Sequence, residues 1–124
     1  MRVGVPREPR PGERLVAATP TTVAQLRKLG YEVVVESGAG VSAAFPDEAY
    51  ADAGAVLTGP AEAWAADVVT TVNTPPQDRL DALSAGQTLV AMLGPASSPD
   101  VVATLAARGV TALALDAVPR ISRA

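Results

Sequence analysis

Apolar residues follow two alternating patterns along this chain. Short runs rich in Val, Leu and Ala are bounded by Gly, Pro, Asn or Asp, which is typical of buried strands. Between these runs, apolar residues recur every three or four positions, which is typical of helices. The runs predict strands at residues 2–5, 31–36, 55–57, 67–72, 88–93 and 111–115, and the intervening segments predict helices at 20–29, 47–53, 61–66, 75–83 and 98–108.

The first predicted helix has clear signals at both of its ends. Thr19 is a good N-cap, and Pro20 is pre-set for the first helical position. Arg27 and Lys28 suit the negative end of the helix dipole, and Gly30 ends the helix. A helix of this length between two strands is a βαβ unit with a right-handed crossover. Its repetition predicts an α/β fold with a doubly wound, mostly parallel sheet, Rossmann-like or flavodoxin-like, and helices on both faces.

The order of these elements also indicates where a ligand is expected. In doubly wound folds, ligands bind beyond the carboxyl ends of the strands, where the strand order reverses. No linker or charge block divides residues 1–124, and this length fits one domain. The loops to consider are therefore those that follow Val5, Glu36, Val72, Leu93 and Leu115.

Composition excludes several classes of function. The chain has ten basic and thirteen acidic residues, a net charge of −3 and no basic stripe, so nucleic acid is not a predicted partner. The absence of cysteine excludes disulfides, and the absence of histidine removes the commonest general base and metal ligand. Pro6, Glu8 and Pro9 interrupt the place where a signal peptide would have its apolar segment. The run from Leu89 to Leu93 is far shorter than the ~20 residues that span a bilayer, and we expect a cytosolic chain.

A glycine motif follows the second predicted strand. Gly38-Ala-Gly40-Val-Ser-Ala43 matches the G-x-G-x-x-G/A dinucleotide pattern, which requires a helix directly after it. Pro46 falls where that helix would be under way, and Phe45-Pro46 favours an extended chain. The next predicted strand ends without the Asp or Glu that would hold a ribose. We therefore predict an ordinary glycine-rich turn here.

The loop after the first predicted strand is rich in charge. It contains Arg7, Arg10 and Arg14 together with Glu8 and Glu13. One interpretation is an anion site at the carboxyl edge of the sheet. The other is a solvated loop of mixed charge, which we favour because surface ion pairs are common and individually weak.

Further polar residues follow the ends of later predicted strands. Asn73 and Thr74 are well placed for a ligand, or they bond the local backbone and start a turn. Asp116 ends the last strand, where it faces the binding edge or acts as a cap or surface charge. Arg120 and Arg123 come directly afterwards, and arginine binds phosphates in a bidentate manner.

Four segments, read together, resemble the N-terminal domain shared by NAD(P) transhydrogenase alpha subunits and alanine dehydrogenases. The first two are Met1-Arg-Val-Gly-Val-Pro-Arg-Glu8 and Val16-Ala-Ala-Thr-Pro20. The third is Tyr31-Glu-Val-Val-Val-Glu-Ser-Gly-Ala-Gly40, in which the glycines are a turn of the family. The fourth, Val118-Pro-Arg-Ile-Ser-Arg-Ala124, is typical of the transhydrogenase branch. The resemblance covers essentially the whole chain.

Departures from the family patterns favour one branch. Alanine dehydrogenases carry a lysine where this chain has Thr71, and a histidine in the segment that here reads Met92-Leu-Gly-Pro95. Those groups hold and deprotonate an amino-acid substrate, whereas transhydrogenation positions two nicotinamide rings and needs neither. The family also has Arg directly before Val-Ala; here Leu15 precedes Val16, and we give no binding role to Arg14.

The resemblance implies a function for the complete protein. Residues 1–124 would be the N-terminal domain, truncated before the NAD-binding Rossmann domain, of the NAD(H)-binding component of a proton-translocating NAD(P)+ transhydrogenase. Hydride would pass from NADH to NADP+, and the isolated chain would be inactive. Arg120 matches the family's cofactor-loop arginine, and Arg123 matches a second arginine of that loop; both are predicted to bind cofactor, and no catalytic residue or metal ligand is predicted.

The resemblance also implies partners and a location. The predicted partners are a second copy in a homodimer, the missing C-terminal NAD-binding domain, and the NADP(H)-binding and membrane components. The complex would be cytoplasmic and peripheral to the inner or plasma membrane. Two alternatives remain open: a fragment of an alanine dehydrogenase, and a stand-alone non-catalytic α/β binding module.

Overall fold

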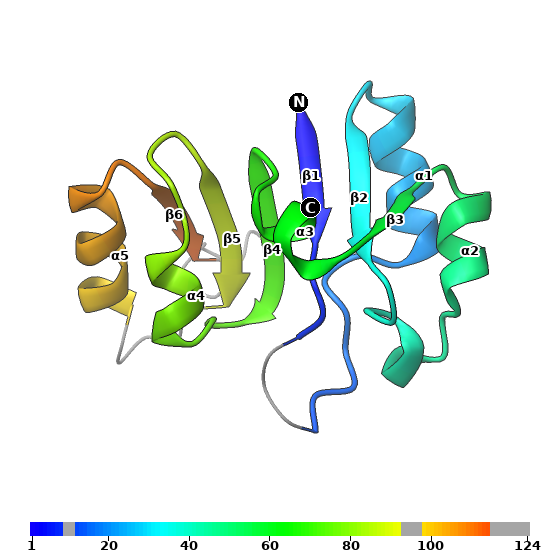
Figure 1. Cartoon of the computed structure of the whole chain (residues 1–124), viewed down its shortest axis with the longest axis horizontal. Helices are drawn as coiled ribbons and strands as arrows, with labels where there is room; N and C mark the ends of the chain where they lie inside the picture. Colours follow the sequence, from blue (N-terminus) through cyan, green and yellow to red (C-terminus); the bar gives the residue numbers. More distant parts are fainter. Residues whose placement is uncertain (9–11, 93–97, 115–124) are drawn as a thin grey trace, which may run out of the picture.

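The fold is a single parallel sheet with a helix between each pair of successive strands (Figure 1). The computed structural model describes residues 1–8, 12–92 and 98–114. In these residues six strands pair in the order β3-β2-β1-β4-β5-β6, and all of the pairings are parallel. The predicted doubly wound α/β fold is therefore confirmed. The strands are β1 (Arg2–Val5), β2 (Glu32–Glu36), β3 (Val56–Thr58), β4 (Val68–Asn73), β5 (Thr88–Met92) and β6 (Thr111–Ala114).

Every predicted helix is present, with differences only at the ends. Thr19 caps α1 as predicted, because its Oγ1 accepts a hydrogen bond from the amide of Thr22 at 3.2 Å. The helix α4 is shorter than predicted, because the backbone of Pro76 is still extended at its N-cap. A short 3-10 helix, η1 (Val41–Ala43), was not predicted. The α-helices are α1 (Pro20–Lys28), α2 (Asp47–Asp52), α3 (Pro60–Trp64), α4 (Gln77–Asp81) and α5 (Ser98–Ala107).

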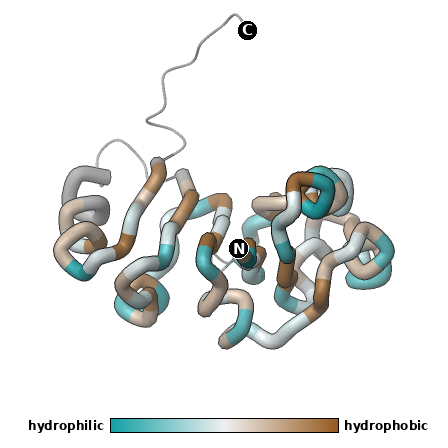
Figure 2. Tube along the Cα trace, turned by 90° about the horizontal axis from the view of Figure 1, so that it is seen from above, coloured by the Kyte–Doolittle hydropathy of each residue, from teal (hydrophilic) through white to brown (hydrophobic). Residues whose placement is uncertain are grey.

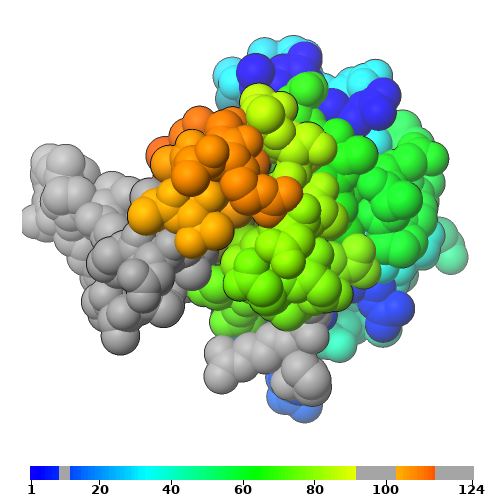
Figure 3. Space-filling view, turned by 60° about the vertical axis from the view of Figure 1, so that its left-hand side comes forward, coloured from blue at the N-terminus to red at the C-terminus, as the bar shows by residue number. Residues whose placement is uncertain are grey.

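Helices cover the two faces of the sheet unequally. Seen along the strands, α1 and α2 lie on one side of β1, β2 and β3, whereas α3, α4 and α5 lie on the other side (Figure 2). In the space-filling view of the second side, the orange residues of α5 and β6 adjoin the yellow-green residues of α4 (Figure 3). The helices change side because the connection from β3 to β4 passes back across β2 and β1, and right-handed crossovers in opposite directions place their helices on opposite faces.

Alternation along the strands divides the core into two clusters. Val33 and Val35 face α1 and α2, and Val34 faces the other side. At Gly4 in β1 there is no room for a side chain, because an added Cβ would collide with the carbonyl oxygen of Ala63 in α3. One cluster contains Val5, Ala18, Val23, Val33, Val35, Ala39, Tyr50 and Ala55, and the other contains Trp64, Val69, Leu80, Leu83, Leu89, Ala91, Leu105 and Val110.

Gln87 is a buried polar side chain that links two backbone segments beside the core cluster that contains Trp64. Its Nε2 donates to the carbonyl oxygens of Trp64 at 2.8 Å and Ala66 at 2.7 Å. Its Oε1 accepts from the amide of Ser84 at 2.6 Å. One side chain therefore joins the end of α3 to the turn before β5.

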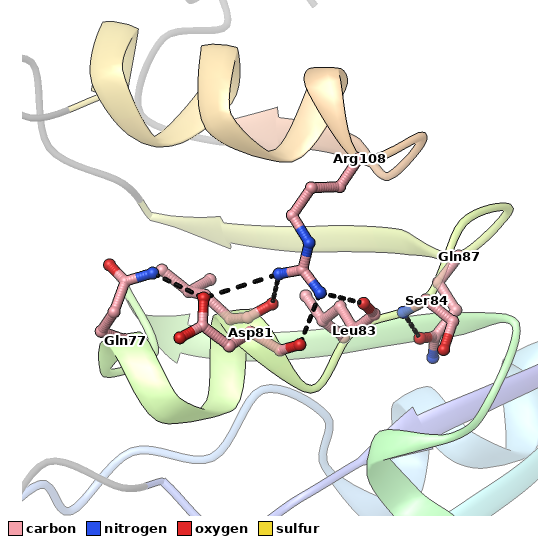
Figure 4. A network of polar contacts seen from close by, with 7 residues as sticks. Gln77, Asp81, Leu83, Ser84, Gln87 and Arg108 are labelled. Carbon is pink, nitrogen blue, oxygen red and sulfur yellow. Dashed lines mark hydrogen bonds and ion pairs between the residues drawn. The ribbon is translucent and has the colours of Figure 1, made fainter.

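Arg108 makes a second tie from the end of α5 (Figure 4). Its guanidinium donates to the carbonyl oxygens of Leu80 at 2.9 Å, of Leu83 at 3.0 Å and of Asp81. These carbonyls belong to the last turn of α4 and the residues after it, which a helix end leaves without partners. Both ties lie at the amino ends of the strands, away from the edge where ligands are expected.

Candidate functional site

The reversal of strand order lies between β1 and β4. These strands are neighbours, but the chain leaves β1 towards α1 on one face and leaves β4 towards α4 on the other. This divergence is the topological switch point of a doubly wound sheet, and ligands bind beyond the carboxyl ends of the strands there. The loop after β1 and the end of β4 therefore form the candidate site.

Glu8 connects the two sides of this switch point. Its Oε2 accepts a hydrogen bond from the amide of Val72 at 2.8 Å, and its Oε1 accepts one from the amide of Asn73 at 3.0 Å. The pairing of β4 with β5 shifts register between Thr70 and Asn73, so the end of β4 is irregular. The carboxylate of Glu8 thus supplies acceptors to amides at the irregular end of the strand.

Glu13 extends the same network. Its Oε1 accepts from the side-chain Nδ2 of Asn73 at 2.6 Å, and its Oε2 accepts from the amide of Leu15 at 2.9 Å. The favoured interpretation of a solvated loop is therefore wrong for Glu8 and Glu13, since both carboxylates bind specific partners. Asn73 also bonds beyond its local backbone, because Glu13 lies 60 positions away in the sequence.

Burial is the main influence on the pKa of the Glu8 carboxyl. Removal from water raises the pKa of this carboxyl above its ordinary value of 4.5, and the nearby charge of Glu13 raises it further. The hydrogen bonds from Val72 and Asn73 oppose this rise, because they stabilise the ionised form. The carboxyl therefore binds its proton more tightly in the folded chain than in water.

Arg7 is the basic residue of this loop whose surroundings are best defined. Its backbone amide donates to Oε1 of Glu36 at 2.9 Å, which fixes the start of the loop to the end of β2. Its exposed side chain lies against Gly38, within 4 Å of the position that a Cβ would occupy. Arg14 is exposed, and Arg10 lies outside the described residues. An anion site in this loop stays a prediction.

The glycine motif is a turn, as predicted. Only the three-residue η1 follows it before Pro46, so no α-helix offers its N-terminus to a phosphate there. The amide of Gly38 is bonded to Oδ1 of Asp47 at 2.8 Å. A Cβ on Gly40 would lie 2.5 Å from the ring of Tyr50, so this glycine is needed for packing.

Tyr50 completes the packing beneath the turn. It is fully buried, and its hydroxyl donates to the carbonyl oxygen of Ala18 at 2.8 Å. Burial and the charge of Asp47 raise the pKa of this phenol. The ring therefore links the glycine turn to the segment before α1 as a neutral hydrogen-bond donor.

Thr71 occupies a closed position near the end of β4. It is 1% exposed, and its hydroxyl donates to the carbonyl oxygen of Asn73 at 2.8 Å. No charged group projects from this position, where the resemblance to alanine dehydrogenases predicts a lysine.

The predicted cofactor residues Arg120 and Arg123 lie outside the described residues, as does Asp116. The same holds for the loops after Leu93 and Leu115. Their roles stay predictions.

The contact between Glu8 and the end of β4 is the feature that the sequence did not reveal. Two features could have indicated this contact. The first and fourth strands are expected to be neighbours at a switch point, and an acidic residue lies just after the first strand. Pairing that residue with the amides at the end of β4 requires the strand order, which local patterns do not contain.

Two other classes of site are absent from the described parts of the chain. No helix there is long and apolar enough to cross a membrane. No cluster of three or more Asp, Glu, His or Cys side chains in those residues is arranged to hold a metal ion.

The sequence and the fold both match known proteins. The family described as alanine dehydrogenase/PNT, N-terminal domain, matches residues 4–124. The chain belongs to this family. It is 44% identical over its whole length to the NAD(P) transhydrogenase subunit alpha of Haemophilus influenzae, of which it covers 24%. It is 38% identical over 95% of its length to the alanine dehydrogenase of Bacillus subtilis, of which it covers 32%.

A solved structure of a transhydrogenase has the same fold. The crystal structure of transhydrogenase from Sinorhizobium meliloti superposes with a TM-score of 0.91 at 33% identity, covering 99% of this chain and 37% of that one. The chain thus spans between 24% and 37% of these relatives. The family and the Rossmann-like fold predicted from the sequence are confirmed.

Proposed function

We propose that this chain is the N-terminal domain of the NAD(H)-binding component of a proton-translocating NAD(P)+ transhydrogenase. The complete protein transfers hydride from NADH to NADP+. The observation that carries the proposal is the chemistry of the binding edge. Thr71 is buried with its hydroxyl engaged, and the chain has no histidine.

This chemistry suits direct transfer between two nicotinamide rings. Oxidation of an amino acid needs a group that takes a proton from the substrate, and histidine is the commonest such group. Transfer between two bound nucleotides needs positioning, and the nucleotides themselves supply the hydride chemistry. The identity of 44% to a transhydrogenase subunit, against 38% to an alanine dehydrogenase, supports the same choice.

The described residues do not themselves form a dinucleotide-binding loop. The amide of Gly38 is bonded to Asp47, and the space beside Gly40 is filled by Tyr50. We therefore place the pyrophosphate loop in a Rossmann domain that follows this chain in the longer protein. Arg120 and Arg123 are the residues through which this chain would reach the cofactor, since guanidinium groups bind phosphates.

The proposal includes partners and location. Relatives bear the name subunit alpha, which fits a component of a larger assembly. We propose a homodimer that contacts an NADP(H)-binding component and membrane components at the cytoplasmic surface of the inner or plasma membrane.

The deciding experiment begins with the native gene product. An antibody against this chain should detect a protein near 40 kDa or larger, as two or more ordinary domains imply. Membranes containing it should transfer hydride from NADH to NADP+ and should not reduce NAD+ with alanine. Alanine-dependent reduction of NAD+ would instead assign an alanine dehydrogenase. A native product of 12.5 kDa would support a stand-alone binding module.

The cofactor role of Arg120 has its own test. In the longer protein, Arg120→Gln should weaken NADH binding roughly 10- to 100-fold, because it removes a hydrogen bond to a charged group worth about 1.5–3 kcal/mol. Arg123→Gln should have a smaller effect. The matched control is Arg2→Gln. Arg2 is exposed at the amino end of β1, away from the binding edge, and it pairs with Glu32 at 3.1 Å. Equal affinities for Arg120→Gln and the control would remove Arg120 from the site.

A further inference from the structure

Three polar groups of Asn73 are held in place at the switch point. Its backbone amide donates to Oε1 of Glu8 at 3.0 Å, and its side-chain Nδ2 donates to Oε1 of Glu13 at 2.6 Å. Its carbonyl oxygen accepts from the hydroxyl of Thr71 at 2.8 Å. Glu8 and Glu13 lie 65 and 60 positions away in the sequence. The loop after β1 therefore fixes the position of Asn73 as much as its own strand does.

The end of β4 depends on Glu8 because the strand is irregular there. Between Thr70 and Asn73, β4 advances three positions while its partner β5 advances two, as in a β-bulge. The amides of Val72 and Asn73 bond to the carboxylate of Glu8 in this stretch. Bulges are common beside active sites, where they re-aim a side chain. The carboxylate of Glu8 thus holds the bulge in one conformation.

Asn73 also lies where a ligand is expected. It is the last residue of β4, and ligands of doubly wound sheets bind beyond the carboxyl ends of the strands at the switch point. Its side chain is half-buried, so it is neither lost in the core nor free to move in solvent. A polar group that is already held in place loses less conformational entropy when it binds a ligand. Asn73 is therefore suited to a contact with the cofactor.

The charge of the surroundings indicates which end of the cofactor fits. Glu8 and Glu13 both bond to Asn73, and no described basic side chain forms an ion pair with Glu8. Carboxylates at this distance would repel the phosphates of a dinucleotide. The nicotinamide ring has a neutral carboxamide, which exchanges hydrogen bonds with an amide side chain, and the oxidised ring is positively charged. The nicotinamide end therefore suits this position better than the phosphates do.

We propose that Asn73 contacts the nicotinamide end of the bound cofactor and that Glu8 is the positioning residue that holds Asn73 there. Glu13 supports this arrangement, because it orients the side-chain amide of Asn73. Arg120 and Arg123, by contrast, are predicted to bind phosphates. The inference rests on the NAD(H)-binding role of the proposed function, but not on the transfer of hydride to NADP+.

Titrations of the longer gene product with two ligands test the proposal. NADH contains the nicotinamide ring, whereas ADP-ribose has the same adenosine and phosphates without the ring. The variants are Asn73→Ala, Glu8→Gln and the double variant, and Arg108→Lys is the matched control. Arg108→Lys also removes hydrogen bonds to the backbone, but at the amino ends of the strands. Thermal melts establish that each variant is folded at the temperature of the titration.

The expected result is a loss of NADH affinity of about 3- to 10-fold in Asn73→Ala, which is typical of one lost hydrogen bond. Glu8→Gln should weaken NADH binding by a similar or smaller factor. The double variant should bind NADH no more weakly than Asn73→Ala, because Glu8 acts through Asn73. The affinity for ADP-ribose should stay within about 2-fold in every variant, and Arg108→Lys should leave both affinities unchanged.

Four outcomes would overturn the proposal. Additive losses in the double variant would show that Glu8 does not act through Asn73. A loss of ADP-ribose affinity equal to that of NADH would place Asn73 at another part of the cofactor. Unchanged NADH affinity in the variants, or a loss in Arg108→Lys as large as that in Glu8→Gln, would leave Glu8 with a structural role only.

A second variant keeps the test decisive if Glu8→Gln does not fold. Glu13→Gln leaves both amides of β4 bonded to Glu8, so it disturbs the side chain of Asn73 and not the end of the strand. It should weaken NADH binding and should add nothing to the loss in Asn73→Ala. An additive loss here would likewise overturn the proposal.

The same preparations separate this inference from the proposed function. A longer protein without measurable affinity for NADH refutes both. Unchanged NADH affinity in the variants of a protein that transfers hydride from NADH to NADP+ refutes the positioning role alone. The expected losses of affinity in a protein that does not transfer hydride refute the proposed activity alone.

Discussion

The link between Glu8 and the end of β4 should contribute measurably to stability. In Glu8→Gln, one oxygen remains to accept a hydrogen bond, and an amino group replaces the other. Either the amide of Val72, now bonded at 2.8 Å, or that of Asn73, now bonded at 3.0 Å, then faces a donor. An unpaired buried amide costs about 1–3 kcal/mol, and removing a partly buried charge offsets some of this. We expect a net loss of about 1–2 kcal/mol, or roughly 3–8 °C in the thermal midpoint.

Urea unfolding followed by fluorescence measures this loss directly. Trp64 is the sole tryptophan and is 6% exposed, so its emission reports the packing of the second core cluster. Glu62→Gln is the control, because Glu62 is exposed in the first turn of α3 and its substitution should change stability by no more than about 0.5 kcal/mol. A loss for Glu8→Gln no larger than that of the control would refute the reasoning.

The pH dependence of Glu8 has a definite sign. Because burial raises its pKa above 4.5, the folded chain binds this proton more tightly than the unfolded chain does. The contribution of Glu8 is therefore fully present below the ordinary pKa and decreases as pH rises through the raised one. The stability difference between the native chain and Glu8→Gln should shrink across that window. In an NMR titration, the carboxyl of Glu8 should have a midpoint above its ordinary value of 4.5; a midpoint below that value would contradict the assigned burial.

Three further substitutions test the packing that supports the site. Gly4→Ala drives a Cβ into the carbonyl oxygen of Ala63, so it should cost about 3 kcal/mol or more in urea unfolding. Gly59→Ala meets no atom within 4 Å and loses only a preferred N-cap residue of α3, so it should cost no more than about 1 kcal/mol. Gln87→Met leaves two carbonyl oxygens without their donor, and we expect a loss of about 2–4 kcal/mol in the same assay; a loss below 1 kcal/mol would mean that water replaces the amide. Arg108→Lys cannot span three carbonyl oxygens, so it should cost about 1–2 kcal/mol and speed amide exchange in α4, and unchanged exchange would show that the tie is not needed.

Local patterns were sufficient for the elements of the fold. The apolar runs gave the strands, because a strand buried on both faces requires consecutive apolar residues. Thr19 and Pro20 marked the start of α1, because capping depends on atoms within one turn of the helix. Pro46 showed that Gly38 and Gly40 form a turn without a following α-helix, since proline acts on its neighbours in the chain. The shortened α4 shows the limit of such signals, because Pro75-Pro76 marks a helix start only to within a residue or two.

The candidate site required the tertiary structure. Glu8 and Glu13 resembled a solvated loop in the sequence, because the groups that bind them lie at the far end of β4. The partial exposure of β5 and β6 on one side of the sheet was likewise invisible, since Val90 and Leu113 have the same apolar character as their buried neighbours.

The sequence by itself thus determined which segments are helices and strands, where they begin and which family they resemble, because these depend on neighbouring residues and on the kinds of side chain present. Only the tertiary structure decided which strand ends meet and which apolar face stays uncovered. Both follow from the order β3-β2-β1-β4-β5-β6, which is set by contacts between residues far apart in the chain.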